Sequence, residues 1–216
     1  MARWAMTIDL RKCIGCSSCV EVCNQVNNVP HESAWRWLID RTSIDDGKIN
    51  RLFLTMNCMH CNNPPCLKVC PTKATYQTRE GIVDIDQKLC VGCSACVLAC
   101  PYQARSINHI SRMNCYEKDH DPSNRTRIED RIGICRKCNF CLPLIKLGVK
   151  NGLKPGQEPG ATPMCVRHCP GEALTFGDID DPTSSISHII SKNKTFRILE
   201  ELGTNPAVYY IPDVEE

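Results

Sequence analysis

Cysteine spacing constrains this chain more than any other feature of its sequence. Sixteen of its eighteen cysteines fall into four sets of four, numbered one to four along the chain. Set two has a wider central gap than the others, and set four is divided by a long insertion. The sets are Cys13, Cys16, Cys19 and Cys23; Cys58, Cys61, Cys66 and Cys70; Cys90, Cys93, Cys96 and Cys100; and Cys138, Cys141, Cys165 and Cys169. A fold for this chain must gather sixteen thiols into a few compact sites.

The run C-x₂-C-x₂-C-x₃-C-P is the ligand signature of cubane [4Fe–4S] clusters, in which the fourth cysteine ligates the neighbouring cluster. Set three has this run in CVGCSACVLACP, and set one has it without the proline. In sets two, three and four, the last cysteine is followed by Pro71, Pro101 and Pro170, respectively. Proline has no N–H and a fixed φ, so it turns the chain out of the site. We therefore interpret the four sets as the ligands of four [4Fe–4S] clusters.

Disulfides and structural zinc are the two other common uses of clustered cysteines. Disulfide-rich scaffolds are small and secreted, whereas this chain has 216 residues and its start, MARWAMTIDL, lacks the apolar segment of a signal peptide. Zinc sites take two Cys-x-x-Cys pairs, and they do not need triplets followed by a fourth cysteine. Both interpretations fit the spacing less well than iron–sulfur clusters do.

Composition agrees with a redox protein. Aromatic residues make up only 6% of the chain, so a conventional core would be thin, and bound clusters would supply much of the stability. The net charge is +2 without a long basic run, which does not indicate nucleic acid binding. No apolar stretch is long enough to span a bilayer. Thiols that receive clusters must stay reduced during assembly, so we expect maturation in the cytosol.

Internal repeats organise the chain. Gly15 and Ser17 of set one match Gly92 and Ser94 of set three, and both sets follow an Ile-Asp pair at the same spacing. The other three sets share a Pro-x-x-Ala segment that begins directly after the last cysteine. Such repeats mark duplication of a supersecondary unit. We expect each unit to be a short strand, a cluster loop, one or two helical turns and a return strand.

Local patterns predict several of these strands. Residues 82–85 alternate between apolar and polar side chains, and the turn at residues 78–81 joins them to residues 74–76 as a hairpin. Residues 6–8 and 174–176 are predicted to be the matching strands of another unit.

Three segments lie outside the repeats. Residues 111–133 are polar and charged, and we expect a surface insertion. Within set four, residues 142–152 are predicted as a short amphipathic helix and residues 153–163, rich in glycine and proline, as a loop. A capped helix is predicted to start at Asp181 or Thr183, followed by a cysteine-free tail to the last residue.

The combination of CMHCNNPPCLKVCPT in set two with a split set four resembles one family. It is the four-cluster electron-transfer (beta) subunit of the molybdopterin oxidoreductases related to dimethyl sulfoxide reductase. Similar subunits serve polysulfide, tetrathionate, arsenate, sulfite and phenylacetyl-CoA oxidoreductases. The resemblance covers nearly the whole chain, including residues 177–182. One departure is that Asn24, instead of proline, follows Cys23, as in many first sets of this family.

The resemblance implies an α+β fold of two ferredoxin-like (4Fe–4S dicluster) units with insertions and a C-terminal docking tail. Residues 1–50 plus 111–180 would form the first unit, which holds sets one and four. Residues 51–110 would form the second unit, which holds sets two and three. Residues 181–216 would be the C-terminal extension.

The resemblance, together with the exchange of the fourth cysteine in ferredoxins, implies four ligand sets, which we name sites I to IV. Site I is Cys13, Cys16, Cys19 and Cys169; site II is Cys58, Cys61, Cys66 and Cys100; site III is Cys90, Cys93, Cys96 and Cys70; site IV is Cys138, Cys141, Cys165 and Cys23. No other residue type replaces a ligand, so all four clusters are expected to be [4Fe–4S] rather than [3Fe–4S].

Four further residues are weaker candidates. Cys115 and Cys135 lie outside the four sets, and we expect free thiols, although Cys135 could form an alternative triplet with Cys138 and Cys141. His60 and His168 stand inside cluster motifs, where a histidine can donate a hydrogen bond to a cluster sulfur or simply pack. For His168 we expect only packing or surface exposure.

The resemblance implies a subunit that relays electrons through four [4Fe–4S] clusters. One partner would be a molybdopterin (Mo or W) catalytic subunit, with site I nearest to its cofactors. The other would be a membrane quinone-reactive subunit or a soluble carrier. The sequence offers no catalytic triad, phosphate loop or poised carboxylate pair, so we expect no substrate chemistry in this chain.

An alternative function is a four-cluster ferredoxin-type carrier for a carbon monoxide dehydrogenase or hydrogenase. The insertion in set four and the tail beyond Asp181 favour the docked subunit, because a diffusing carrier needs no extended docking surface. We expect a cytoplasmic location, with membrane association only through a partner. The alternative is the periplasm, reached by co-export with the catalytic subunit.

Overall fold

Short helices alternate with small sheets throughout the molecule. The computed structural model describes residues 2–29, 33–45, 47–107 and 132–213. The elements are β1 (Trp4–Asp9), α1 (Ser18–Asn27), β2 (Arg36–Asp45), β3 (Lys48–Asn57), α2 (Pro65–Lys68), β4 (Thr75–Gln77), β5 (Val83–Ile85), α3 (Ala95–Leu98), β6 (Ser106–Ile107), β7 (Cys135–Arg136), α4 (Leu142–Lys150), η3 (Pro159–Ala161), α5 (Met164–Arg167), β8 (Leu174–Asp178), α6 (Ser185–Lys192), η4 (Glu200–Leu202) and β9 (Val208–Ile211). This mixture agrees with the predicted α+β class.

A three-stranded sheet in the order β8-β1-β9 organises the first unit. β1 pairs antiparallel with β8, so that Thr7 lies opposite Thr175, which confirms the two strands predicted from the repeat. β1 also pairs in parallel with β9, and Met6 lies opposite Val208. Five of the six residues of β1 are buried, because α6 packs on this sheet and the main core lies against it.

The second unit contains two smaller pairs of strands. β4 and β5 form the predicted hairpin, with Tyr76 opposite Asp84. Its turn is closed by the Thr78 N–H, which donates to the Ile82 carbonyl at 2.8 Å. β6 pairs with β7, so that Ile107 lies opposite Cys135. This pairing places Cys135 in the second unit, whereas the predicted division assigned residues 111–180 to the first.

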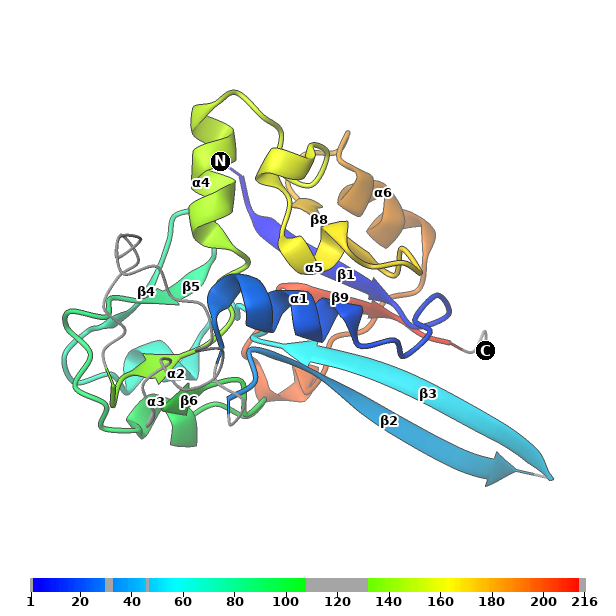
Figure 1. Ribbon diagram of the computed structural model, residues 1–216, viewed down its shortest axis with the longest axis horizontal. Helices are drawn as coiled ribbons and strands as arrows, with labels where there is room; N and C mark the ends of the chain where they lie inside the picture. Colours follow the sequence, from blue (N-terminus) through cyan, green and yellow to red (C-terminus); the bar gives the residue numbers. More distant parts are fainter. Residues whose placement is uncertain (1, 30–32, 46, 108–131, 214–216) are drawn as a thin grey trace, which may run out of the picture.

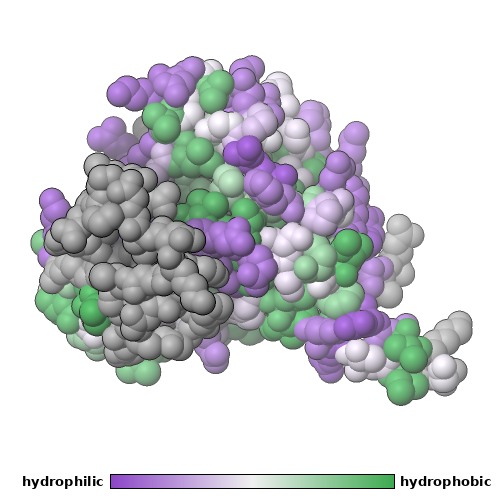
Figure 2. Space-filling model, in the orientation of Figure 1, coloured by the Kyte–Doolittle hydropathy of each residue, from purple (hydrophilic) through white to green (hydrophobic). Residues whose placement is uncertain are grey.

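A long hairpin of β2 and β3 projects from the body of the molecule (Figure 1). The pairing runs over ten residues of each strand, from Arg36 opposite Asn57 to the turn at Gly47. Ile44 and Ile49 lie opposite each other near the tip and are 71% and 73% exposed, and hydrophobic colouring marks this end in Figure 2. The predicted domain boundary between residues 50 and 51 falls inside β3.

The C-terminal segment contributes to the core of the first unit. Val208 and Tyr210 of β9 are fully buried, and the Tyr210 hydroxyl donates to the Thr55 carbonyl at 3.1 Å. The segment predicted as a docking tail therefore supplies a strand of the central sheet; its docking role stays a prediction.

Two helices were predicted from the sequence in and after set four, and the structure contains both, as α4 and α6. α4 confirms the helix predicted over residues 142–152. α6 starts later than predicted, at Ser185, because the Ser184 hydroxyl accepts from the Ser187 N–H at 3.2 Å and acts as the N-cap. Most of the predicted insertion at residues 111–133 lies outside the described residues. No helix in the described part of the chain is long and apolar enough to cross a membrane.

Candidate iron–sulfur sites

The site I cysteines surround one hollow of about 360 Å³. Cys13, Cys16 and Cys19 come from the loop after β1 and the first turn of α1. Cys169 lies two residues beyond the end of α5 and lines the same hollow. α1 and α5 contact each other, and this contact brings residues more than 140 positions apart to one place.

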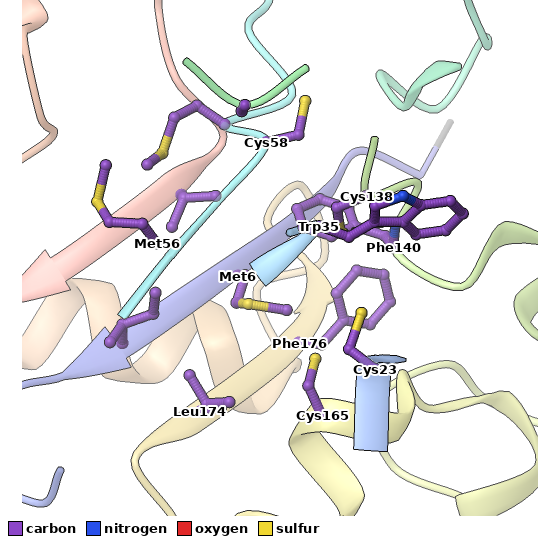
Figure 3. Close-up of a cluster of buried hydrophobic side chains, with 14 of the residues drawn as sticks. Met6, Cys23, Trp35, Met56, Cys58, Cys138, Phe140, Cys165, Leu174 and Phe176 are labelled. Atoms are coloured by element: carbon purple, nitrogen blue, oxygen red, sulfur yellow. Dashed lines mark hydrogen bonds between the residues drawn. The ribbon is translucent and has the colours of Figure 1, made fainter. Parts of the chain in front are cut away.

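Site IV draws on the same two helices. Cys23 from α1 and Cys165 from α5 line a hollow of about 330 Å³ with Cys138 and Cys141. Figure 3 shows Cys23 and Cys165 beside Phe176, and Cys138 beside Trp35 and Phe140. α1 carries one thiol of each site, Cys19 and Cys23, whereas α5 carries Cys165, with Cys169 two residues beyond its end. This is the exchange that the family resemblance implies.

Site III repeats this arrangement in the second unit. Cys90, Cys93 and Cys96 line a hollow of about 320 Å³ together with Cys70 of the preceding set. Here α2 and α3 are the helices in contact.

The site II thiols are identified by their effects on one another. Burial, with smaller contributions from the nearby thiols of Cys58, Cys66 and Cys100, raises the pKa of the Cys61 thiol to about 12. Burial likewise raises the pKa of Cys100, with a contribution from Cys58. The four cysteines of site II thus lie close together, with Cys100 supplied by set three.

Tight loops around these sites depend on left-handed backbone. Gly15 and Gly92 have φ of +70° and +69°, and Ser17 and Ser94 follow at +59° and +63°. A Cβ on Gly92 would lie 1.8 Å from the carbonyl oxygen of Gly133, so only glycine fits there. The matching residues of the two repeats therefore have the same backbone geometry.

Backbone amides point at sulfur in each of the three hollows. The N–H groups of Thr75 and Ala173 donate to the Sγ atoms of Cys70 and Cys169 at 3.4 and 3.3 Å. The Cys135 N–H donates to Cys90 Sγ at 3.4 Å, and the Phe140 N–H donates to Cys138 Sγ at 3.5 Å. Such bonds help to set the potential of a bound cluster.

The donor sets fit a cubane cluster. Each hollow is bordered by the four thiols of its ligand set, with Cys135 in addition at site III, and every cysteine that the structure describes is free. In the described ranges, no three His, Cys, Asp or Glu side chains are close enough together to hold a single metal ion. Four thiols spread around a hollow, with amides directed at sulfur, suit a cluster with its own sulfides.

Exposure separates the sites into two kinds. Cys16 of site I and Cys93 of site III are exposed, and the apolar residues beside them, Ile14 and Val91, are 62% and 65% exposed. At sites II and IV, by contrast, all the cysteines are buried except Cys100 and Cys141, which are partly buried.

The loops of sites II and IV meet at His60. This side chain is 1% exposed and stacks on Phe140 with ring centroids 3.8 Å apart. Burial lowers its pKa well below the usual range, and its Nδ1 accepts from the Val83 N–H at 3.2 Å. Its Nε2 is buried without a partner in the described residues. His168, in contrast, is exposed and contacts only the Met164 carbonyl of its own helix at 2.9 Å among the described residues.

Cys135 lies at site III rather than site IV. It lines the same hollow as Cys90, and its Sγ is 3.5 Å from that of Cys96. The alternative triplet with Cys138 and Cys141 would need it at the site IV hollow, which those two cysteines line without it. Cys115 lies outside the described residues.

Two buried arginines beside the sites were not singled out from the sequence. Arg36 and Arg105 are 1% and 5% exposed. Arg36 stands between two tryptophans and Arg105 follows a Pro-x-x-Ala segment, but neither pattern indicates burial beside cysteines.

Residues 12–74 and residues 49–118 each match a family described as a 4Fe-4S dicluster domain. The protein is thus an iron–sulfur protein of the dicluster class, with four [4Fe–4S] clusters as its cofactors. Both matched ranges join sets that are consecutive in sequence, whereas site I in the structure takes Cys169 from set four.

Similar proteins of known name identify the family within this class. The sequence is 37% identical to a selenate reductase subunit of Mesobacillus selenatarsenatis, over 97% of this chain and 72% of the relative. It is 37% identical to a tetrathionate reductase subunit of Salmonella typhimurium, over the same two shares. It is 36% identical to a polysulfide reductase chain of Wolinella succinogenes, over 98% and 95%. This protein belongs to the family of iron–sulfur electron-transfer subunits of dimethyl sulfoxide reductase-type oxidoreductases.

Proposed function

We propose that this chain holds four [4Fe–4S] clusters in sites I to IV, with the ligands assigned above, and relays electrons between two partner proteins. One partner is a molybdopterin-containing catalytic subunit. The other is a membrane quinone-reactive subunit or a soluble carrier. The observation that carries the proposal is the gathering of each expected ligand set around one place, because a relay needs complete sites close to one another.

The order of the relay follows from which sites share elements. Sites I and IV share α1 and α5. The stacked pair of His60 and Phe140 connects the loops of sites IV and II. Sites II and III are joined by the contact of α2 and α3, which carry Cys66 and Cys96. This gives the order I, IV, II, III, with the exposed sites I and III at the two ends.

The ends are where electrons enter and leave. The exposed Cys16 and Cys93 mark places where a partner can approach a cluster, while the interior sites are shielded from solvent. We assign site I to the catalytic subunit, as the family resemblance implies, and site III to the other partner. The chain itself supplies no substrate chemistry in this scheme.

Replacing one ligand at each end tests this order. In the complex with Cys16→Ser, turnover through the physiological partner should collapse, while a dye that reacts directly with the catalytic subunit should still support turnover. Electrons supplied at the catalytic subunit should reduce none of the remaining clusters of this chain. With Cys93→Ser as the matched variant, the same electrons should still reduce the clusters of sites I, IV and II.

Rapid-freeze electron paramagnetic resonance (EPR) spectroscopy of intact complexes that keep their other three clusters measures both results. The reverse pattern would place site III at the catalytic subunit. Equal loss of dye-coupled and physiological turnover in the Cys16→Ser complex would remove the proposed order altogether. Purification of the native protein as a free monomer would favour the diffusing carrier of the alternative function.

The proposed compartment is the cytoplasm, with the membrane reached through a partner. Fractionation of cells that lack the catalytic subunit should leave the location of this chain unchanged. A shift from the periplasm to the cytoplasm in those cells would support co-export instead.

A further inference from the structure

In each ferredoxin-like unit, one of the buried basic side chains is an arginine next to residues of both sites. Arg36 is the first residue of β2 and is 1% exposed; Arg105 directly precedes β6 and is 5% exposed. A buried guanidinium is costly unless hydrogen bonds and an opposite charge compensate it. The groups that compensate each guanidinium therefore indicate the role of the two arginines.

Arg36 has neutral acceptors. Its Nη1 donates to Thr55 Oγ1 at 3.1 Å, and its Nη2 donates to Asn57 Oδ1 at 2.9 Å. The Met6 sulfur, a weak acceptor, lies 3.0 Å from Nη2. These bonds orient the guanidinium, but none of them supplies negative charge.

The negative charge comes from the sites on either side. Arg36 itself lines the hollow of site IV, while Thr55 lines the hollow of site I and has its hydroxyl 3.6 Å from Cys19 Sγ. Burial alone would lower the pKa of Arg36, but the thiols of Cys165 and Cys19 raise it. One guanidinium thus interacts with thiols of both sites of the first unit.

Arg105 has the same surroundings in the second unit. Its Nη1 donates to Thr75 Oγ1 at 3.1 Å, and Thr75 lines the hollow of site III. Its Nη2 donates to Cys66 Sγ of site II at 3.1 Å. Burial alone would lower its pKa, but thiols of site II and Cys96 of site III raise it. Again a threonine orients an arginine between two sites.

We propose that Arg36 and Arg105 are internal counter-charges, each shared by the two clusters of its unit, which raise the reduction potentials of both clusters. The inference rests on the proposed function, because it requires clusters in all four sites. A cluster carries more negative charge after it accepts an electron, so a fixed cation nearby stabilises the reduced form. Both guanidinium groups are buried, so the interaction is screened far less than at the surface.

Sharing one cation between two clusters has a consequence for the relay. An electron is attracted to the same guanidinium from either cluster, so both members of a pair are shifted in the same direction. The shared cation therefore raises both potentials of a unit together, so the loss of one arginine should move both clusters of that unit. Arg36 acts on sites I and IV, and Arg105 acts on sites II and III.

Charge-removing and charge-keeping variants of the loaded protein test the proposal. Arg36→Gln and Arg105→Gln remove the charge and keep amide donors, whereas Arg36→Lys and Arg105→Lys keep the charge. Arg51→Gln is the control, because Arg51 lies on the same hairpin as Arg36 but is 58% exposed and paired with Asp40 at 2.5 Å. Iron content and circular dichroism verify each variant before its clusters are titrated by EPR-monitored potentiometry.

Arg36→Gln should lower two of the four midpoint potentials, and Arg105→Gln should lower the other two. We expect at least a tenfold change in the ratio of reduced to oxidised cluster at a fixed potential, which is about 59 mV for a one-electron couple. The lysine variants should stay closer to the wild type than the glutamine variants, and Arg51→Gln should shift nothing.

Unchanged potentials in an iron-replete Arg36→Gln or Arg105→Gln protein would overturn the proposal, as would lysine variants that shift as far as the glutamine variants. A shift of the same two clusters by both arginines would also overturn it. If the glutamine variants lose iron, the lysine variants test the proposal instead. Lysine variants with four loaded clusters at wild-type potentials would support the proposal. Lysine variants that lose iron or have shifted potentials would refute it. Fewer than four titrating clusters in the wild type would instead refute the proposed function.

Discussion

Gly92 is the residue whose replacement tests most sharply how the backbone builds a cluster site. Its φ of +69° is left-handed, and an alanine in that conformation costs about 1–2 kcal/mol. A Cβ would also lie 1.8 Å from the carbonyl oxygen of Gly133, which would have to move beyond 3.4 Å to relieve the contact. Because this neighbour is backbone, no side-chain rotation can relieve it.

The displaced segment leads directly to site III. Gly133 stands two residues before Cys135, whose N–H donates to Cys90 Sγ at 3.4 Å. Movement of this segment should remove that bond and open the hollow. We therefore expect Gly92→Ala to lose the site III cluster alone, which lowers the iron content from about sixteen to about twelve atoms per protein molecule.

Two other glycines distinguish the effect of the steric clash at the Cβ position from the effect of the left-handed backbone conformation. Gly152→Ala is the control, because Gly152 has a φ of +76° but no atom within 4 Å of its Cβ position. Gly15→Ala should have an intermediate effect, since its Cβ would lie 2.4 Å from the Phe53 ring, which is a side chain and can rotate. Iron and sulfide analysis with EPR spectroscopy measures all three variants. An iron content for Gly92→Ala equal to that of Gly152→Ala would refute the argument.

Two further predictions concern single hydroxyl and thiol groups. Cys135→Ser should leave the iron content unchanged, because four thiols besides Cys135 line the site III hollow; loss of about four iron atoms would make Cys135 a ligand. Ser184→Ala should destabilise the loaded protein by about 1 kcal/mol through loss of the α6 N-cap, measured by thermal unfolding, with Ser191→Ala near the helix end as the control. An equal effect of both substitutions would exclude a specific capping role for Ser184.

Features that depend on local spacing could be predicted from the sequence. The four cysteine sets fix which residues form cluster loops, and the alternation at residues 82–85 identifies β5. The exchange of Cys23 and Cys169 between sets was implied by the family resemblance, and the structure gathers these cysteines at sites IV and I. These features follow from patterns within a few residues or from duplication.

Features that depend on distant packing could not be predicted in this way. β9 has no repeat partner, and its parallel pairing with β1 joins segments about 200 residues apart in the sequence. Nothing in the sequence singled out the long hairpin of β2 and β3. Arg36 is polar by residue type, and its burial depends on negative sites that only the assembled fold brings around it.

The iron and sulfide content of the protein tests the central claim most directly. Four complete ligand sets call for about sixteen iron atoms and about sixteen acid-labile sulfides per molecule in anaerobically purified protein. These values, without stoichiometric zinc, are the result that four cubane clusters predict. A content near eight of each, or stoichiometric zinc in place of iron, would contradict it.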